Sequence, residues 1–131
     1  MNVFDDMSLE DKIRYANALL PGEPAPDNEN DPRWEAMLEI AYHLEGEPEP
    51  IWRFIKKWGV HEQDDLRSGI ACCLLEHLLE YHFEEYFPRV TELAKENSLF
   101  SKTVFFCRKF GKSKLPENAA KLDGLLESLQ H

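Results

Sequence analysis

Four residues near the middle of the chain carry side chains suited to chemistry, namely Glu76, His77, Glu80 and Glu84. On a helix, where each residue turns by about 100°, they share one arc of the surface. Carboxylates and imidazoles transfer protons and bind metal ions, so the arc suits a small metal-dependent enzyme that uses Glu76, His77 and Glu80. It also suits a charged surface that contacts a partner.

The spacing of these residues favours the second interpretation. Helical di-iron sites use Glu-x-x-His, and no histidine lies three positions after Glu76 or Glu80. The zinc-protease motif His-Glu-x-x-His is absent as well, because Leu78 follows His77. We therefore predict no metal and no cofactor. We interpret the four residues as an exposed acidic face that binds a partner, and keep the metal-dependent enzyme as an alternative.

A second candidate site is the basic segment 102–114, which contains no acidic residue. Its five cations are interleaved with three phenylalanines, and they are Lys102, Arg108, Lys109, Lys112 and Lys114. Cations beside aromatic rings are typical of contacts with phosphate groups or nucleic acids. The net charge of −10 opposes binding to a polyanion, so this contact is kept as an alternative function. The same cations also suit the C-terminal end of a helix.

The negative charge is concentrated at the start of the chain. Residues 1–50 hold 13 acidic residues against Lys12, Arg14 and Arg33, which accounts for the whole net charge of −10. Acidic and basic residues are equally numerous over residues 51–131. An uneven field of this kind orients a partner of opposite charge. The charge pattern therefore predicts a non-enzymatic protein–protein interaction module whose partner has a basic surface.

The element that must position the acidic face is a long central helix, predicted over residues 64–83. Most residues from Ile70 to Leu79 are apolar, so other elements must cover most of this helix. Asp64 is placed to cap its first turn. Arg67 lies on the apolar side, where we expect a structural role for the guanidinium.

Shorter helices are predicted on both sides of the central one. Ser8, Asp31 and Asn97-Ser98 mark helix starts, and Pro88 predicts a break near residues 82–87. The shorter helices are expected over residues 8–20, 31–44, 50–59, 88–96, 98–111 and 116–129. No segment alternates as a strand does, so we predict an all-α fold of six to seven helices.

Two features of the first 50 residues complete this prediction. In the helix over residues 31–44, apolar residues recur at helical spacing and are expected to face the core, namely Trp34, Met37, Leu38, Ala41 and Tyr42. Residues 21–30 are polar and rich in proline, which predicts a mobile loop.

A weak internal repeat groups the predicted helices. Arg33 and Arg67 each lie near the start of a helix, and the spacing between them equals the spacing between Asp64 and Ser98. This shared offset predicts antiparallel helical hairpins followed by a terminal helix. Stacked hairpins of this kind are the pattern of an α-solenoid.

The run from Ile51 to Leu79 carries the clearest unit of this repeat. It contains Trp52 and Phe54-Ile55, a polar turn, and then Asp65-Leu66-Arg67-Ser68-Gly69-Ile70-Ala71 with Leu74. This pattern resembles the HEAT repeat family, in which an Arg near the start of the second helix packs against a neighbouring turn. Arg67 matches that Arg. The family's Asp six residues earlier is His61 here, so the resemblance implies that Asp64 or Asp65 takes its structural role.

The resemblance, which extends to small helical proteins of bacteria, implies a short HEAT-like α-solenoid that acts as a binding scaffold. At 131 residues the chain is predicted to form one domain over residues 1–131. No apolar run reaches the roughly 20 residues of a membrane span, and the first residues do not read as a signal peptide. Three cysteines without Cys-x-x-Cys spacing predict buried, reduced thiols. We therefore expect a cytoplasmic protein without a membrane partner.

Overall fold

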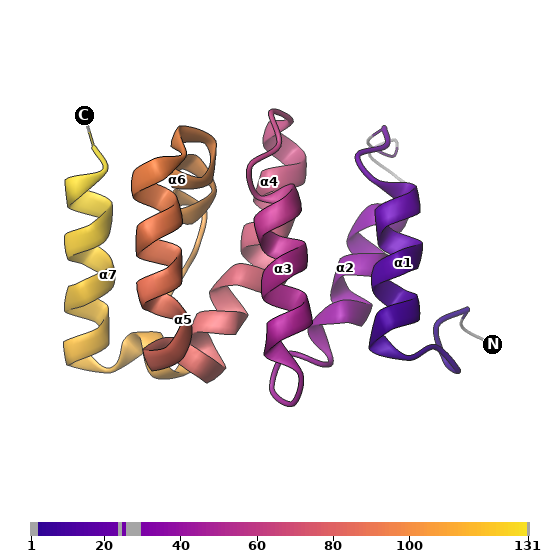
Figure 1. Ribbon diagram of the computed structural model, residues 1–131, viewed down its shortest axis with the longest axis horizontal. Helices are drawn as coiled ribbons and strands as arrows, with labels where there is room; N and C mark the ends of the chain where they lie inside the picture. Colours follow the sequence, from indigo (N-terminus) through magenta and orange to yellow (C-terminus); the bar gives the residue numbers. More distant parts are fainter. Residues whose placement is uncertain (1–2, 24, 26–29, 131) are drawn as a thin grey trace.

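The computed structural model describes residues 3–23, 25 and 30–130, and among these residues it contains helices and no strand (Figure 1). The elements are α1 (Leu9–Leu19), α2 (Pro32–Ala41), α3 (Pro48–Trp58), α4 (Asp64–Ile70), η1 (Ala71–Leu75), α5 (Glu76–Glu96), α6 (Ser98–Phe105), η2 (Gly111–Lys114) and α7 (Pro116–Ser128). Element η1 is a π-helical turn, and η2 is a 3₁₀ turn. The all-α prediction is confirmed. Within the described ranges, no helix is long and apolar enough to cross a membrane.

Side-chain caps start three of these helices at the predicted residues. The Ser8 hydroxyl accepts the N–H of Asp11 at 3.2 Å, and the Asp31 carboxylate accepts the N–H of Arg33 at 2.9 Å. Asn97 caps α6 in the same way. The prediction that Asp64 caps the central helix is wrong, because Asp64 is already its first helical residue and Gln63 precedes it without a side-chain cap.

The helices lie in two rows. In Figure 1, α1, α3 and α7 stand upright in a front row, and α2 and α4 lie behind it. Contacts join α1 to α2, α3 to α4 and η1, and α5 to α6, so helices that are neighbours in sequence pack against each other. α1 also contacts α3, and α2 contacts α4 and η1, which joins the first pair of helices to the second.

The central helical run, from α4 through η1 into α5, bends at His82. The backbone angles of this residue are φ −134° and ψ 45°. Its Nε2 donates to the carbonyl oxygens of Leu44 and Glu45, at 3.0 Å each, and these bonds hold the bend against the turn after α2. The break predicted near residues 82–87 is thus found at His82. The prediction that a separate helix begins at Pro88 is wrong, because α5 continues through that residue.

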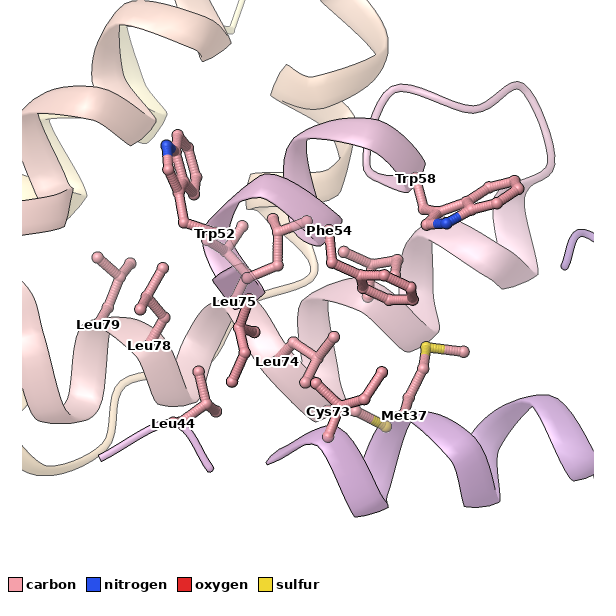
Figure 2. Close-up of a cluster of buried hydrophobic side chains, with 14 of the residues drawn as sticks. Met37, Leu44, Trp52, Phe54, Trp58, Cys73, Leu74, Leu75, Leu78 and Leu79 are labelled. Carbon is pink, nitrogen blue, oxygen red and sulfur yellow. The ribbon is translucent and has the colours of Figure 1, made fainter. Parts of the chain in front are cut away.

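The core lies where the central run meets α2 and α3. Figure 2 labels ten side chains of this cluster: Met37, Leu44, Trp52, Phe54, Trp58, Cys73, Leu74, Leu75, Leu78 and Leu79. Leu74 and Leu78 have no exposed surface, which confirms that other elements cover the central helix. Burial of a leucine side chain contributes about 1.5–3 kcal/mol relative to exposure, so this cluster is a main source of stability.

Several helix ends differ from the prediction. α2 ends at Ala41 rather than near residue 44, and α3 begins two residues early, at Pro48. α6 ends at Phe105 rather than Gly111, because the Phe106 N–H turns back to the carbonyl of Thr103 and tightens the last turn. Half of the loop predicted at 21–30, namely residues 24 and 26–29, lies outside the described residues.

Candidate functional site

The acidic face of the central helix is only in part the open surface that the sequence predicts, because Glu84 is exposed whereas Glu76 is buried. Glu76 is only 5% exposed. Its Oε1 accepts a hydrogen bond from the backbone N–H of Arg108 at 2.9 Å. Burial raises the pKa of the Glu76 carboxyl, while the Arg108 N–H acts in the opposite direction. The prediction that Glu76 is exposed is therefore wrong.

The ring of His77 lies between two carboxylates. Its Nδ1 is 2.7 Å from Oε1 of Glu80, and its Nε2 is 3.6 Å from Oε2 of Glu76. Phe110 stacks on the same ring, with centroids 5.2 Å apart. The imidazole is thus held by contacts from its own helix and from a segment that lies well beyond it in the sequence.

Residues 106–114, which we call the covering segment, contact each member of the acidic face. Besides the contacts of Arg108 and Phe110, Gly111 lies against Glu80, and the Lys112 ammonium is 3.8 Å from Oε2 of Glu84. Gly111 has φ +50°, and a Cβ there would lie 2.6 Å from Cγ of Glu80, so the approach requires glycine. The two candidate sites found in the sequence are therefore partners of each other.

This arrangement leaves little for a bound metal. Among the described residues, no group of three or more His, Cys, Asp and Glu side chains is placed to hold a metal ion. Glu76 and Glu80 already receive a backbone N–H and an imidazole, respectively. The metal-dependent alternative built on Glu76, His77 and Glu80 thus gains no support from the geometry.

The cations of the basic segment do not converge on one point. Lys109 pairs with Asp123 of α7 at 2.6 Å, and Lys112 faces Glu84. Lys102 and Lys114 are exposed and make no ion pair within the described part of the chain. The segment therefore presents dispersed charges rather than an anion-binding cluster.

Arg67 and its acidic neighbours occupy the start of the central run. Arg67 is 1% exposed, its Nε donates to the carbonyl of His61 at 2.7 Å, and its Nη2 pairs with Asp64. Burial lowers the pKa of the Arg67 guanidinium. Asp65 instead pairs with Arg33 at 2.6 Å. Asp64 and Asp65 thus bind different arginines.

Sequence reasoning missed the role of Arg33. This buried guanidinium binds Asp31 through Nε and Nη2, reaches Asp65 of α4, and donates to the carbonyl of Pro21 at 3.1 Å. It therefore links the end of α1, the start of α2 and the start of α4. The usable signal was the Asp31-Pro32-Arg33 sequence at a helix start, one repeat before Arg67.

The three cysteines show no sign of a nucleophile. Burial raises the pKa of Cys73 to about 12, and it raises the pKa of Cys107 well above its ordinary value. The pKa of Cys72 is also raised, first by burial and then by the charge of Glu76. A thiol reacts as its thiolate, so these environments favour the unreactive form.

A groove at the N-terminal end of the molecule was also missed. Its volume is about 470 Å³, and we call it the N-terminal groove. It is lined by Val3, Phe4, Glu35, Leu38, Glu39 and Tyr42.

Three of the four apolar side chains that line the N-terminal groove are unusually exposed, and the fourth, Phe4, is buried. Tyr42 is 77% exposed, Val3 61% and Leu38 52%. The prediction that Leu38 and Tyr42 face the core is wrong, because α2 buries Met37 and Ile40 instead. Apolar residues gathered around an exposed groove are typical of an interaction site.

Acidic groups surround these apolar side chains. Glu39 pairs with the Lys12 ammonium at 3.2 Å, and the same ammonium lies 6.0 Å from the centre of the Tyr42 ring. Glu35 is exposed and makes no ion pair among the described residues. The groove therefore offers an aromatic ring, aliphatic surface and a free carboxylate side by side.

Comparisons with known proteins identify no relative of this chain. No protein-family model, no curated protein and no solved structure matches it.

Proposed function

We propose that this chain is a cytoplasmic, non-enzymatic protein-binding module that binds a basic protein surface through its acidic first half. The observation that carries the proposal is the N-terminal groove, with its exposed Tyr42 and Leu38 beside Glu35. In the same proposal, the helical hairpins stack as a short HEAT-like α-solenoid, and the groove lies at one end of the stack.

Interface energetics support an anchor role for Tyr42. Residues that dominate protein interfaces are enriched in tyrosine, tryptophan and arginine, and they lie among apolar contacts that exclude water. Tyr42 is the most exposed of the large apolar side chains in the described residues, and Leu38 and Val3 line the same groove. A partner that covers these three side chains would remove apolar surface from water, which favours association.

The two ends of the molecule support the same assignment. α7 forms the C-terminal end and turns polar residues to solvent, among them Glu117, Lys121 and Glu127. In stacked helical arrays, a terminal helix with a polar outer face acts as a cap. The N-terminal end exposes apolar residues instead, as expected of a surface that a partner covers.

Charge specifies the partner. Residues 1–50 carry a net charge of −10, so two copies joined through this end would repel each other. A lysine- or arginine-bearing surface with an apolar anchor meets both requirements of the groove. Within the chain, the Lys12 ammonium pairs with Glu39 and lies near the Tyr42 ring. A lysine or arginine of the partner could pair with Glu35 in the same way.

Affinity capture with matched variants tests this proposal. Immobilised wild-type protein, a Leu38→Ser/Tyr42→Ala double variant and a Tyr81→Ala control are each exposed to the native lysate. Tyr81 is partly exposed on the central run and is not among the residues that line the N-terminal groove. We expect a basic protein that the wild type and the control retain and the double variant loses.

The captured protein then gives a second measurement. Charge complementarity mainly raises the association rate, and salt screens it over about 8 Å at physiological ionic strength. We expect the association rate to fall as salt rises. A partner that binds all three proteins equally, at a rate indifferent to salt, would contradict the proposal.

A further inference from the structure

A second groove, of about 520 Å³, runs between α1 and α3 on the front row of helices. α1 contributes Leu9, Glu10, Ile13 and Asn17 to its lining. α3 contributes Pro50, Arg53, Phe54 and Lys57, and Glu47 immediately precedes α3. The first turns of the two helices face each other, as do their last turns. The groove therefore follows two parallel helices for about two turns.

The floor of this α1–α3 groove is apolar. Leu9 of α1 and Phe54 of α3 are buried beneath it, and Ile13 and Pro50 are the half-buried apolar residues that line it. Asn17 is the polar group at the far end, and its Oδ1 already accepts the Trp58 indole N–H at 2.8 Å. An apolar side chain can enter the groove without leaving this amide oxygen unpaired.

The acidic groups on the rim are already engaged. Glu10 pairs with Arg14 at 3.2 Å, and Glu47 lies 3.1 Å from Nδ1 of His43. Glu49, which interacts electrostatically with Arg53, accepts hydrogen bonds from the Tyr86 hydroxyl and Arg89. The carboxylates around the groove therefore have contacts of their own, and the imidazole of His43 balances the charge of Glu47 only when it is protonated.

The cations on the opposite rim are available to a carboxylate. Arg53 and Lys57 are exposed, and neither makes an ion pair among the described residues, although the Lys57 ammonium lies 5.2 Å from the centre of the Trp58 ring. They lie four residues apart on α3, so they share one bank about 6 Å apart along the helix axis. The groove thus combines an apolar floor with a cationic bank.

We propose that the α1–α3 groove docks an amphipathic helix from an acidic partner protein. Two carboxylates one turn apart on that helix would face Arg53 and Lys57, and leucine-like side chains would cover Ile13 and Pro50. An apolar helix face laid into a groove, with charges at its edge, is a common mode of peptide recognition. The charge of this partner is opposite to the charge of the partner expected at the N-terminal groove. This inference does not rest on the proposed function.

A peptide pair tests the charge requirement directly. The probe is a fluorescein-labelled, hydrocarbon-stapled helix of about 12 residues with two leucines and two glutamates at i and i+4 spacing, because a free peptide of that length is only marginally helical in water. A second peptide replaces the glutamates by lysines. Fluorescence anisotropy with the full-length protein is expected to show at least about tenfold tighter binding of the glutamate peptide, a difference of about 1.4 kcal/mol.

Two charge-reversal variants locate the binding. Arg53→Glu/Lys57→Glu is expected to weaken binding of the glutamate peptide by about tenfold or more. Lys102→Glu/Lys114→Glu makes the same change in net charge on exposed residues outside the groove, and it should change the affinity by less than about twofold. Circular dichroism verifies that both variants keep the wild-type fold.

Methyl NMR of Leu9 and Ile13 gives an independent readout, since both side chains line the groove. Their signals should shift on addition of the glutamate peptide and stay in place with the lysine peptide. Three results would overturn the inference: absence of binding, equal binding to both charge-reversal variants, or preference for the lysine peptide. Self-association of the wild type that Arg53→Glu/Lys57→Glu abolishes would also overturn it, because the occupant would then be a second copy of this chain.

Discussion

The molecule has two acidic helix surfaces with opposite fates. On the central run, Glu76 is buried beneath the covering segment and bound by the Arg108 N–H, across 32 residues of sequence. On α2, Glu35 lies open beside Leu38 and Tyr42 in the N-terminal groove. In the sequence the two surfaces have the same pattern, because each consists of carboxylates on a predicted helix. What separates them is whether another part of the same chain returns to cover the face.

The largest contrast is expected between a leucine of each surface. Leu78→Ala empties a fully buried site and should lower the free energy of unfolding by about 2–5 kcal/mol. Leu38→Ala removes a half-exposed side chain and should change it by less than about 0.5 kcal/mol. Urea unfolding followed by circular dichroism measures both. Equal losses would mean that the described difference in burial is wrong.

The next effect concerns the closest contact of the covering segment. Gly111→Ala places a Cβ 2.6 Å from Cγ of Glu80 at a positive φ, and should destabilise the fold by about 2–3 kcal/mol. Gly124 is the control, because a Cβ there meets nothing within 4 Å. In the middle of α7, Gly124→Ala should stabilise the protein by up to about 1 kcal/mol. A neutral Gly111→Ala would show that the segment does not hold the position described.

A smaller effect is expected at Glu76. Glu76→Ala leaves the partly buried Arg108 N–H without this acceptor and should cost about 1–3 kcal/mol, whereas Glu76→Gln keeps an acceptor oxygen and should cost less. Denaturation curves of the two variants, recorded under identical conditions, give the difference. If both variants lost the same free energy of unfolding, the hydrogen bond from the Arg108 N–H would not contribute to stability.

The pH dependence of Glu76 sharpens the same comparison. Burial raises its pKa in the folded protein above the ordinary value of 4.5, so the folded state binds the proton more tightly than the unfolded state. As pH falls from neutrality towards 4.5, the wild type should therefore gain stability relative to Glu76→Gln. Unfolding free energies of both proteins at pH 7 and pH 5 measure this gain. A gap that stays constant would contradict the burial of an ionised carboxyl.

The smallest change in stability is expected at the open surface. Glu35→Lys should alter the free energy of unfolding by less than about 0.5 kcal/mol, because the side chain is exposed and unpaired in the described residues. The same variant should slow association with a captured basic partner and flatten its salt dependence. Stopped-flow or surface-based kinetics would measure the rate. Unchanged kinetics would place the partner elsewhere on the protein.

Local signals in the sequence predicted much of the fold. Ser8, Asp31 and Asn97-Ser98 start helices because their side chains satisfy free backbone N–H groups, and this chemistry is local. The apolar density around Leu74 and Leu78 likewise predicted a covered central helix. Such features need no knowledge of which distant segments meet.

The wrong predictions concern places where contacts between distant segments determine the end or the bend of a helix. α6 ends at Phe105 although the phenylalanine spacing continues to Phe110, and the Thr103 hydroxyl donates to the carbonyl of Gly59, 44 residues away. The residues released from that helix become the covering segment, which buries Glu76. The bend at His82 likewise depends on carbonyls of the turn after α2. Pairing of this kind cannot be inferred from helical periodicity.

Leu38 and Tyr42 were misplaced for the opposite reason. They continue the apolar stripe of α2, and a stripe of that width predicts burial on all of its residues. In the described structure, α2 lies at one end of the helix rows, where its outer side has no further helix beside it. The sequence shows the width of an apolar stripe but not the number of neighbours available to cover it.

The π-helical turn η1 holds one residue more than an α-helix holds over the same length, so it is equivalent to a one-residue insertion within a helix. Because the turn takes up the extra residue locally, the residues after it keep the orientation that a regular helix one residue shorter would give them. A one-residue deletion within Ala71–Leu75 should therefore restore regular α-helix and leave Glu76 facing Arg108. A deletion in a regular turn of α5 would instead rotate the residues after it by about 100°. The contact between the two candidate sites should therefore tolerate the loss of one residue in η1 better than the same loss within α5.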